Sequence, residues 1–280
     1  MRFGAPPGGP RAGWYPDPAG YPVLRYYDGR VWTTATSGMT TFEPAPDHPV
    51  LDLRVAVGAV VVLITSLVAS RFLLDAIVRF DWPIAVYTAI SILAGYGPSV
   101  GWCWYASRRW GTGRLLADFG VRVRWVDLGW GPLIWITAVA CELFVIVLVQ
   151  ALEIPLTSNT EGIGELDLDR TYVVSLLIAA VVAAPIVEEL VFRGALLRGL
   201  RSRMPAVAAI GVQGALFGLA HVDPVRGAGN IGLAIVLAAV GVALGGAAYL
   251  LHRIGPVVIA HAILNAVVMA VVLTDSLPAS

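Results

Sequence analysis

The sequence predicts an all-α membrane protein, a polytopic bundle of about seven transmembrane helices preceded by a small β-rich soluble domain. Of its 280 residues, 58% are apolar and only 14% are charged. The mean hydropathy is +0.77, which is far from the balance of a soluble domain. From residue 53 onward, apolar windows of about 20 residues recur, the length that spans a bilayer. The chain before residue 53 is polar and rich in Gly and Pro.

The N-terminal region, residues 1–38, has the composition of a small separate domain. Aromatic residues alternate around Asp28-Gly29 within GWYPDPAGYPVLRYYDGRVWTTATSG, which predicts two short strands joined at a DG turn. The elements GWYPDP, LRYYDG and WT resemble a short bacterial domain of unknown function that precedes membrane segments. That resemblance implies a soluble cytoplasmic appendage. Residues 39–52 read as a Pro-rich linker, in which His48 is expected to be exposed and without function.

Seven apolar windows follow the linker, and each predicts one transmembrane helix. The fourth exceeds the bilayer thickness and is expected to emerge into water, while the fifth is short and ends at His221. The predicted spans are 53–74, 82–105, 131–152, 171–197, 205–221, 229–251 and 255–274. We divide this region into N-terminal helices with an interfacial segment, an acidic external loop and a core, at residues 53–152, 153–170 and 171–274.

Arginine positions orient the bundle, because short cytoplasmic loops accumulate positive charge. Arginines occur before the first span, between the second and third, and after the fourth, whereas the loop that follows the third is acidic. A multi-pass protein of the cell membrane with a cytoplasmic N-terminus and seven crossings satisfies these loops. Arg71 and Arg79 oppose this arrangement, since both fall on the outside. Residues 113–130 mix apolar and arginine positions and are expected to lie along the cytoplasmic interface.

Several functional classes are not supported by the sequence. The 19 positive side chains are all arginine, they are balanced by 19 negative ones, and no basic run suggests nucleic-acid binding. Cys103 and Cys141 fall in apolar segments without metal-ligand spacing and are expected to pack. No HExxH, GxSxG or P-loop motif is present, and nothing indicates a cofactor. Membrane lipid is the expected surrounding, and the sequence does not indicate an oligomeric state.

Six polar residues lie inside the predicted spans, where each ionisable group costs about 2.5–3.5 kcal/mol on insertion scales. Proteins that carry several such groups at this depth usually use them. The six come from three segments, as EELVFR, FGLAH and HAILN. They are Glu188, Glu189, Arg193, His221, His261 and Asn265.

The spacing of these residues suggests a division of labour. Glu189 and Arg193 are four apart on a helix, so they can pair and offset each other's desolvation. Glu188 points about 100° away on the same helix, where it and His221 could deprotonate one water molecule. His261 and Asn265 are also four apart, and an imidazole and a carboxamide are good donors to a developing oxyanion. This chemistry is complete without a metal or a covalent nucleophile.

In this order and context, the motifs EExxxR, FxxxH and HxxxN resemble the CPBP intramembrane glutamic endopeptidases. That family includes proteases of CAAX-containing prenylated proteins and bacteriocin-processing proteins. The resemblance covers residues 171–274 and implies water-mediated hydrolysis of a peptide or membrane-protein substrate inside the bilayer. By motif position, Glu188 and His221 would activate water and Glu189 with Arg193 would organise the site. His261 and Asn265 would form the oxyanion hole.

Other readings remain open from the sequence. Glu189 with Arg193 can be a structural ion pair, and Asn265 can be a hydrogen-bonding contact between helices. Two histidines and a glutamate could instead bind zinc in a membrane metalloprotease. A non-catalytic scaffold or immunity protein would keep the motifs without turnover. A proton-coupled transporter also uses intramembrane carboxylates, although the lack of an internal repeat argues against it.

Overall fold

The computed structural model describes residues 12–18, 24–37, 51–158, 160, 170–223 and 227–275. The chain forms two compact units, residues 1–47 and 48–280. His48, most of the predicted linker and most of the acidic loop lie outside the described residues.

The N-terminal unit contains a three-stranded antiparallel sheet in the order β1-β2-β3. Its strands are β1 (Gly13–Pro16), β2 (Leu24–Tyr27) and β3 (Trp32–Ser37). The predicted turn joins β2 to β3: Gly29 has a φ of 95°, and Asp28 Oδ1 accepts from the N–H groups of Arg30 and Val31 at 2.7 and 2.8 Å. These backbone N–H groups hold the pKa of Asp28 below its usual value. The sequence analysis missed β1, which pairs with β2 through Trp14 opposite Tyr26.

The second unit is helical. Its helices are α1 (Leu53–Ile77), α2 (Ile84–Trp110), α3 (Leu115–Asp118), α4 (Asp127–Ala151), α5 (Arg170–Leu177), α6 (Ala184–Glu189), α7 (Leu197–Arg201), α8 (Ala206–Leu219), α9 (Gly229–Leu251) and α10 (Gly255–Asp275). A single 3₁₀ turn, Val78–Phe80, follows α1. The π-helical stretches Ile178–Ala183 and Leu190–Leu196 join α5, α6 and α7 into one helical rod.

Six of these helical segments are long and apolar enough to cross a membrane, so the predicted membrane bundle is confirmed. They are Leu53–Phe80, Ile84–Trp110, Asp127–Ala151, Arg170–Arg201, Gly229–Leu251 and Gly255–Thr274. The predicted fifth span is the exception, because α8 has only 14 residues. At 1.5 Å per residue it reaches about 21 Å, short of a hydrocarbon core of about 30 Å. It therefore ends within the depth of the bundle.

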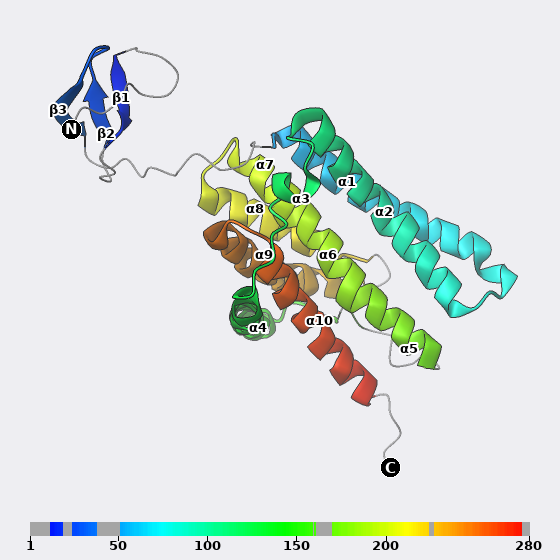
Figure 1. Ribbon diagram of the computed structural model, residues 1–280. Helices are drawn as coiled ribbons and strands as arrows, with labels where there is room; N and C mark the ends of the chain where they lie inside the picture. Colours follow the sequence, from blue (N-terminus) through cyan, green and yellow to red (C-terminus); the bar gives the residue numbers. More distant parts are fainter. Residues whose placement is uncertain are drawn as a thin grey trace. The chain divides into compact units, whose positions relative to one another are not determined.

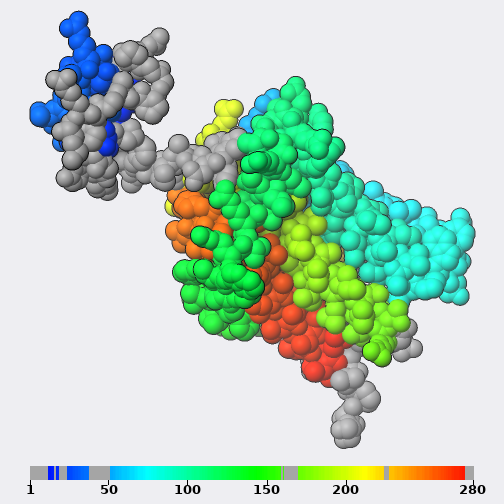
Figure 2. Space-filling view, viewed as in Figure 1, coloured from blue at the N-terminus to red at the C-terminus, as the bar shows by residue number. Residues whose placement is uncertain are grey.

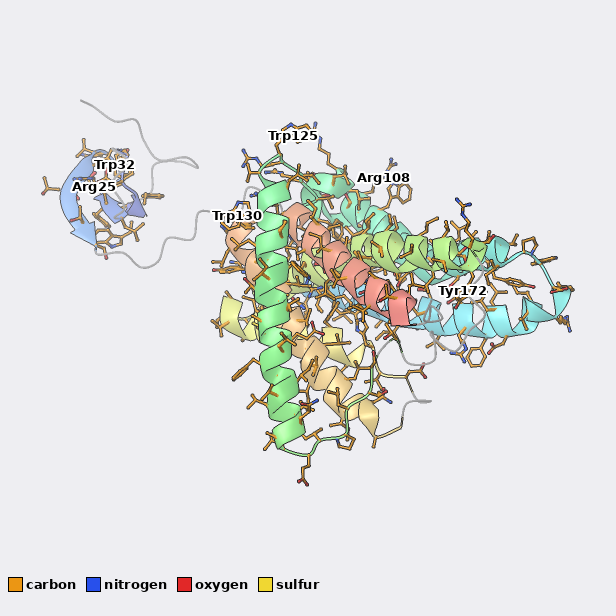
Figure 3. The ribbon with its side chains drawn as sticks, turned by 90° about the horizontal axis from the view of Figure 1, so that it is seen from below. Arg25, Trp32, Arg108, Trp125, Trp130 and Tyr172 are labelled. Carbon is orange, nitrogen blue, oxygen red and sulfur yellow. The ribbon has the colours of Figure 1, made fainter. Side chains whose placement is uncertain are left out.

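The rod α5–α7 lies between the α1–α2 hairpin and α10 (Figures 1 and 2). On the other side α8 packs against α9, and α4 packs against both α9 and α10. Figure 3 shows α4 running across the direction of α10, with Trp125 and Trp130 near its first turn. The α8–α9 contact is close, since a Cβ on Gly218 would lie 2.1 Å from the carbonyl oxygen of Ala234.

The arginine-bearing helix ends meet at one end of the bundle. Arg253, after α9, pairs with Asp127 at the start of α4 at 2.5 Å. The N–H of Ile254 donates to the Gly120 carbonyl at 2.9 Å. The helix starts and ends at this end carry Arg54, Arg108, Arg109, Arg114, Arg122, Arg124, Arg198, Arg201, Arg203 and Arg253. At the opposite end the loop after α4 meets the start of α9, where the Gly232 N–H donates to the Pro155 carbonyl at 3.0 Å.

Candidate active site

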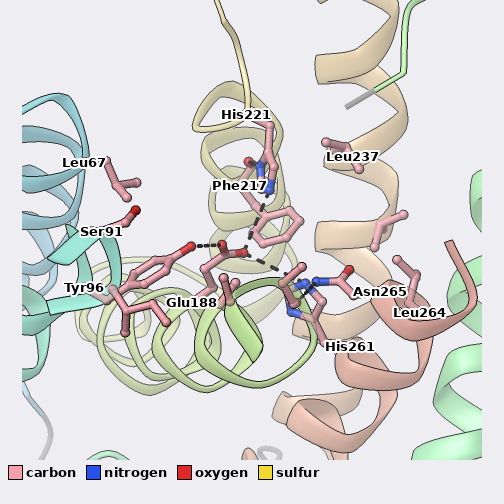
Figure 4. Close-up of a pocket in the computed structure, with 15 residues that line it drawn as sticks. Leu67, Ser91, Tyr96, Glu188, Phe217, His221, Leu237, His261, Leu264 and Asn265 are labelled. Atoms are coloured by element: carbon pink, nitrogen blue, oxygen red, sulfur yellow. Dashed lines mark hydrogen bonds and ion pairs between the residues drawn. The ribbon is translucent and has the colours of Figure 1, made fainter. Parts of the chain in front are cut away.

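Four of the six predicted polar residues meet where α2, α6, the end of α8 and α10 converge (Figure 4). Glu188, His221, His261 and Asn265 line a cavity of about 310 Å³. Glu189 does not line the cavity itself but contacts the lining residue His261. The remaining lining residues are mostly apolar or small: Leu67, Ser91, Ile92, Tyr96, Ala179, Ala180, Ala184, Phe217, Leu237, Val240 and Leu264.

Glu189, Arg193 and His261 form a connected buried group. Arg193 Nη1 donates to Glu189 Oε1 at 2.8 Å, and His261 Nδ1 lies 2.8 Å from the same oxygen. Glu189 and Arg193 are 0% and 1% exposed. The second arginine nitrogen, Nη2, donates to the carbonyl of Gly241 in α9 at 3.2 Å. The expected pairing of Glu189 with Arg193 is therefore present, and it also holds the ring of His261.

Glu188 faces the cavity and points one carboxylate oxygen at two imidazoles. Glu188 Oε2 lies 3.9 Å from Nε2 of His221 and 3.9 Å from Nε2 of His261. This oxygen is buried and has no hydrogen-bond partner among the described residues. Both distances exceed the length of a direct hydrogen bond, and a bridging water molecule could span them. Glu188 Oε2 is therefore an acceptor oxygen that lies between two ring nitrogens.

His221 lies just beyond the end of α8, in a turn, whereas the sequence prediction placed it within the fifth span. The N–H of His221 donates to the Gly218 carbonyl at 3.1 Å, which closes the last turn. Its side-chain Nδ1 lies 2.8 Å from the Phe217 carbonyl oxygen. A carbonyl only accepts, so Nδ1 carries the hydrogen. In the neutral ring Nε2 is then an acceptor, and it faces the cavity.

Asn265 is held by an irregularity in the helical rod. In the stretch Ile178–Ala183 the N–H of Ala184 donates to the Ala179 carbonyl, five residues back. In this register the Ala180 carbonyl would face the nitrogen of Pro185, which has no hydrogen. Asn265 Nδ2 donates to that carbonyl at 2.7 Å instead. This contact fixes the carboxamide and leaves its second N–H for another acceptor.

Tyr96 of α2 belongs to the same site and was missed by the sequence analysis. Its hydroxyl donates to Glu188 Oε1 at 3.3 Å. The sequence held one indication of this role. Tyrosines of membrane helices favour the membrane interfaces, whereas Tyr96 lies near the middle of α2, where a polar partner is needed. In the part of the chain that the structure describes, no group of three His, Cys, Asp or Glu side chains is arranged to hold a metal ion.

Two parts of the chain match known protein families. Residues 170–267 match the family model of the Rce1-like type II CAAX prenyl endopeptidases. This part of the chain is an Rce1-like domain. Residues 12–50 match DUF2510, a family of unknown function. No curated protein and no solved structure matches the chain.

The predicted resemblance to CAAX proteases is thereby confirmed. The Rce1-like domain contains all six residues predicted from the motifs, and it begins at the first residue of α5. With six membrane-capable helices, the chain is a multi-pass intramembrane protease, which acts on a peptide or protein substrate. The helices α1 to α4 lie outside the match, although α2 contributes to the cavity.

Proposed function

We propose that the protein is a metal-independent glutamic endopeptidase that hydrolyses a peptide bond of a membrane-associated protein or peptide. The observation that carries this proposal is the convergence of Glu188 Oε2 with the Nε2 atoms of His221 and His261, 3.9 Å from each. A water molecule among these atoms could donate its hydrogens to Glu188 Oε2 and to His221 Nε2. The surroundings are apolar, which strengthens each polar contact with that water.

Glu188 and His221 are the proposed water-activating pair. The Phe217 carbonyl fixes the hydrogen of His221 on Nδ1, so Nε2 presents a lone pair to the cavity. Water can then donate one hydrogen to Glu188 Oε2 and the other to this nitrogen. Both contacts raise the nucleophilicity of the water oxygen, and Glu188 accepts the proton as the oxygen attacks.

His261 and Asn265 are the proposed oxyanion donors. His261 Nδ1 faces the Glu189 carboxylate, so Nε2 can donate only when the ring is protonated. An imidazolium at His261 would also balance the charges of the two carboxylates and the Arg193 guanidinium. Asn265 supplies the N–H that Ala180 does not use.

In the proposed reaction, water adds to the substrate carbonyl group and the peptide bond then breaks. The water oxygen bonds to the substrate carbonyl carbon, and one water proton passes to Glu188. The C–N bond then breaks, and Glu188 returns this proton to the leaving amine. The other water hydrogen leaves with the new carboxyl group. No metal, cofactor or covalent enzyme intermediate takes part in this sequence.

We propose that the protein lies in the cell membrane with the arginine-rich end of the bundle facing the cytoplasm. The N-terminus is then cytoplasmic. The ten arginines at the helix ends and the exposed Trp125 beside them support this orientation. We also propose the division predicted from the sequence. It consists of a soluble domain (1–38), a linker (39–52), the first helices (53–152), an external loop (153–170) and the core (171–274).

Hydrolysis can be tested with a library of quenched-fluorescent peptides and purified protein in detergent. We expect cleavage by the wild type that Glu188→Gln abolishes and that a chelator leaves unchanged. Glu142→Gln is the matched control, since Glu142 is also a glutamate inside a span, in α4, but does not line the cavity. It should retain activity.

The other outcomes separate the alternatives. Activity that is lost with chelator and restored by zinc would favour the metalloprotease and contradict the glutamic mechanism. Full activity of Glu188→Gln would refute the role of this carboxylate. An intact, folded wild type that cleaves no peptide in detergent or in vesicles would favour the scaffold or immunity protein.

A further inference from the structure

Tyr96 reaches the catalytic carboxylate from a helix that lies outside the Rce1-like domain. Its hydroxyl donates to Glu188 Oε1 at 3.3 Å, on the oxygen opposite the one that faces the imidazoles. In Figure 4 the tyrosine and the histidines lie on opposite sides of Glu188. Arg193, the arginine on the same helix, pairs with Glu189 and not with Glu188. Tyr96 is therefore placed to set which way this carboxylate points.

We propose that Tyr96 is a positioning residue, which holds Glu188 so that Oε2 faces Nε2 of His221, the proposed water-activating nitrogen, as well as Nε2 of His261. This inference rests on the proposed function of Glu188. It also assigns the α1–α2 hairpin a part in the active site, because Leu67, Ser91, Ile92 and Tyr96 form the wall opposite α10. The hairpin is then a component of the enzyme as well as a membrane anchor.

The packing of the hairpin explains how Tyr96 comes to this position. Ser66 Oγ of α1 donates to the Gly95 carbonyl of α2 at 2.6 Å. A Cβ on Gly95 would lie 3.2 and 3.3 Å from Leu67 and Ser70, so glycine allows the two helices to approach closely. One residue further, the side chain of Tyr96 turns away from α1 toward α6. The helix contact beside it thus fixes the direction from which the hydroxyl meets Glu188.

The role has two consequences for catalysis. The hydrogen bond to Oε1 leaves the other carboxylate oxygen, Oε2, for the water. A carboxylate without its anchor also rotates, and misplacement of a catalytic group by about 1 Å can cost 10²-fold in rate. Substrate contacts are unaffected, since the Tyr96 ring remains. The hydroxyl should therefore act on kcat and leave KM unchanged.

Tyr96→Phe in the full-length protein tests this directly. We expect kcat to fall by about 10-fold or more with KM unchanged. Tyr87→Phe is the matched control on the same helix. The Tyr87 hydroxyl accepts from the Trp82 N–H at 2.9 Å and donates to backbone carbonyls of the α1–α2 turn. Its loss should lower the melting temperature and leave kcat unchanged.

If Tyr96→Phe does not fold, 4-fluorophenylalanine at position 96 keeps the shape of the side chain and removes the hydrogen-bond donor, and kcat should fall in the same way. An unchanged kcat in either variant, with activity still dependent on Glu188, would overturn the role of Tyr96 alone. Full activity of Glu188→Gln would instead remove the proposed function on which this inference rests.

Discussion

Replacing Arg193 by glutamine should destabilise the folded bundle by about 3–5 kcal/mol, the cost of leaving a buried charge without its partner. Both side chains of the Glu189–Arg193 pair are fully buried, and the atoms that pair lie 2.8 Å apart. The arginine also donates to the Gly241 carbonyl, and its guanidinium carbon lies 4.4 Å from the centre of the Phe217 ring. Glutamine can replace one of these hydrogen bonds but none of the charge.

The exposed pair Arg71–Asp75 in α1 provides an internal control with the same i,i+4 spacing. Its closest atoms lie 3.7 Å apart, and its side chains are 66% and 67% exposed. We expect Arg71→Gln to cost at most about 0.5 kcal/mol. Unfolding in mixed micelles with rising SDS fraction gives the free energy of unfolding of both variants and of the double variant Glu189→Gln with Arg193→Gln.

The double variant decides whether the cost arises from the unpaired charge. Removing both charges should restore part of the stability lost in Arg193→Gln, so the two effects should not add. A loss for Arg193→Gln no larger than that for Arg71→Gln would refute the reasoning, because Glu189 would then be hydrated or neutral without its arginine. Strictly additive effects would also contradict it.

Three further predictions concern other parts of the bundle. Gly218→Ala should prevent folding or destabilise strongly, since its Cβ would lie 2.1 Å from the Ala234 carbonyl oxygen. Gly211→Ala on the same helix meets no atom within 4 Å and should stabilise by up to about 1 kcal/mol, and thermal melting measures both. Asn265→Leu should lower activity and stability, and Pro185→Ala should reduce the stability loss because it returns an N–H to the Ala180 carbonyl, which a double-mutant cycle in the unfolding assay will detect. Asp52 caps α1, and the hydrogen bond from the Arg54 side chain holds the Asp52 pKa below its usual value. The stability that Asp52→Ala removes should therefore be present above the usual pKa of an aspartate and disappear as the pH falls through the lowered pKa, as melting curves against pH will test.

The membrane bundle could be predicted because it follows from length and hydropathy alone. An apolar window of about 20 residues has few alternatives to a spanning helix, so six of the seven windows became span-length helices. The fifth window, which is short, was harder to predict. His221 lies beyond the helix because α8 ends two residues earlier, and sequence periodicity does not fix helix ends. The strand β1 was missed because it contains Pro16, which lacks a backbone N–H, and because it does not adjoin the Asp-Gly turn that marks β2 and β3.

The polar residues of the site were predictable because they are costly in an apolar segment. The i,i+4 spacing also predicted the contact between Glu189 and Arg193, which the structure contains. Their tertiary partners were not predictable. Nothing in the spacing shows that His261 turns Nδ1 to Glu189, or that Tyr96 reaches Glu188 from α2. The π-helical register at Ala180, which accounts for the Asn265 contact, depends on the packing of the rod.

An experimental structure of the full-length protein in lipid, at a resolution that shows ordered water, tests the central claim most directly. We predict a water molecule within hydrogen-bond distance of Glu188 Oε2 and the Nε2 atom of His221, with no anomalous signal from a transition metal. A metal ion bound by the two histidines and Glu188 would contradict the account. A direct hydrogen bond between Glu188 and His221 that leaves no room for water would contradict it equally.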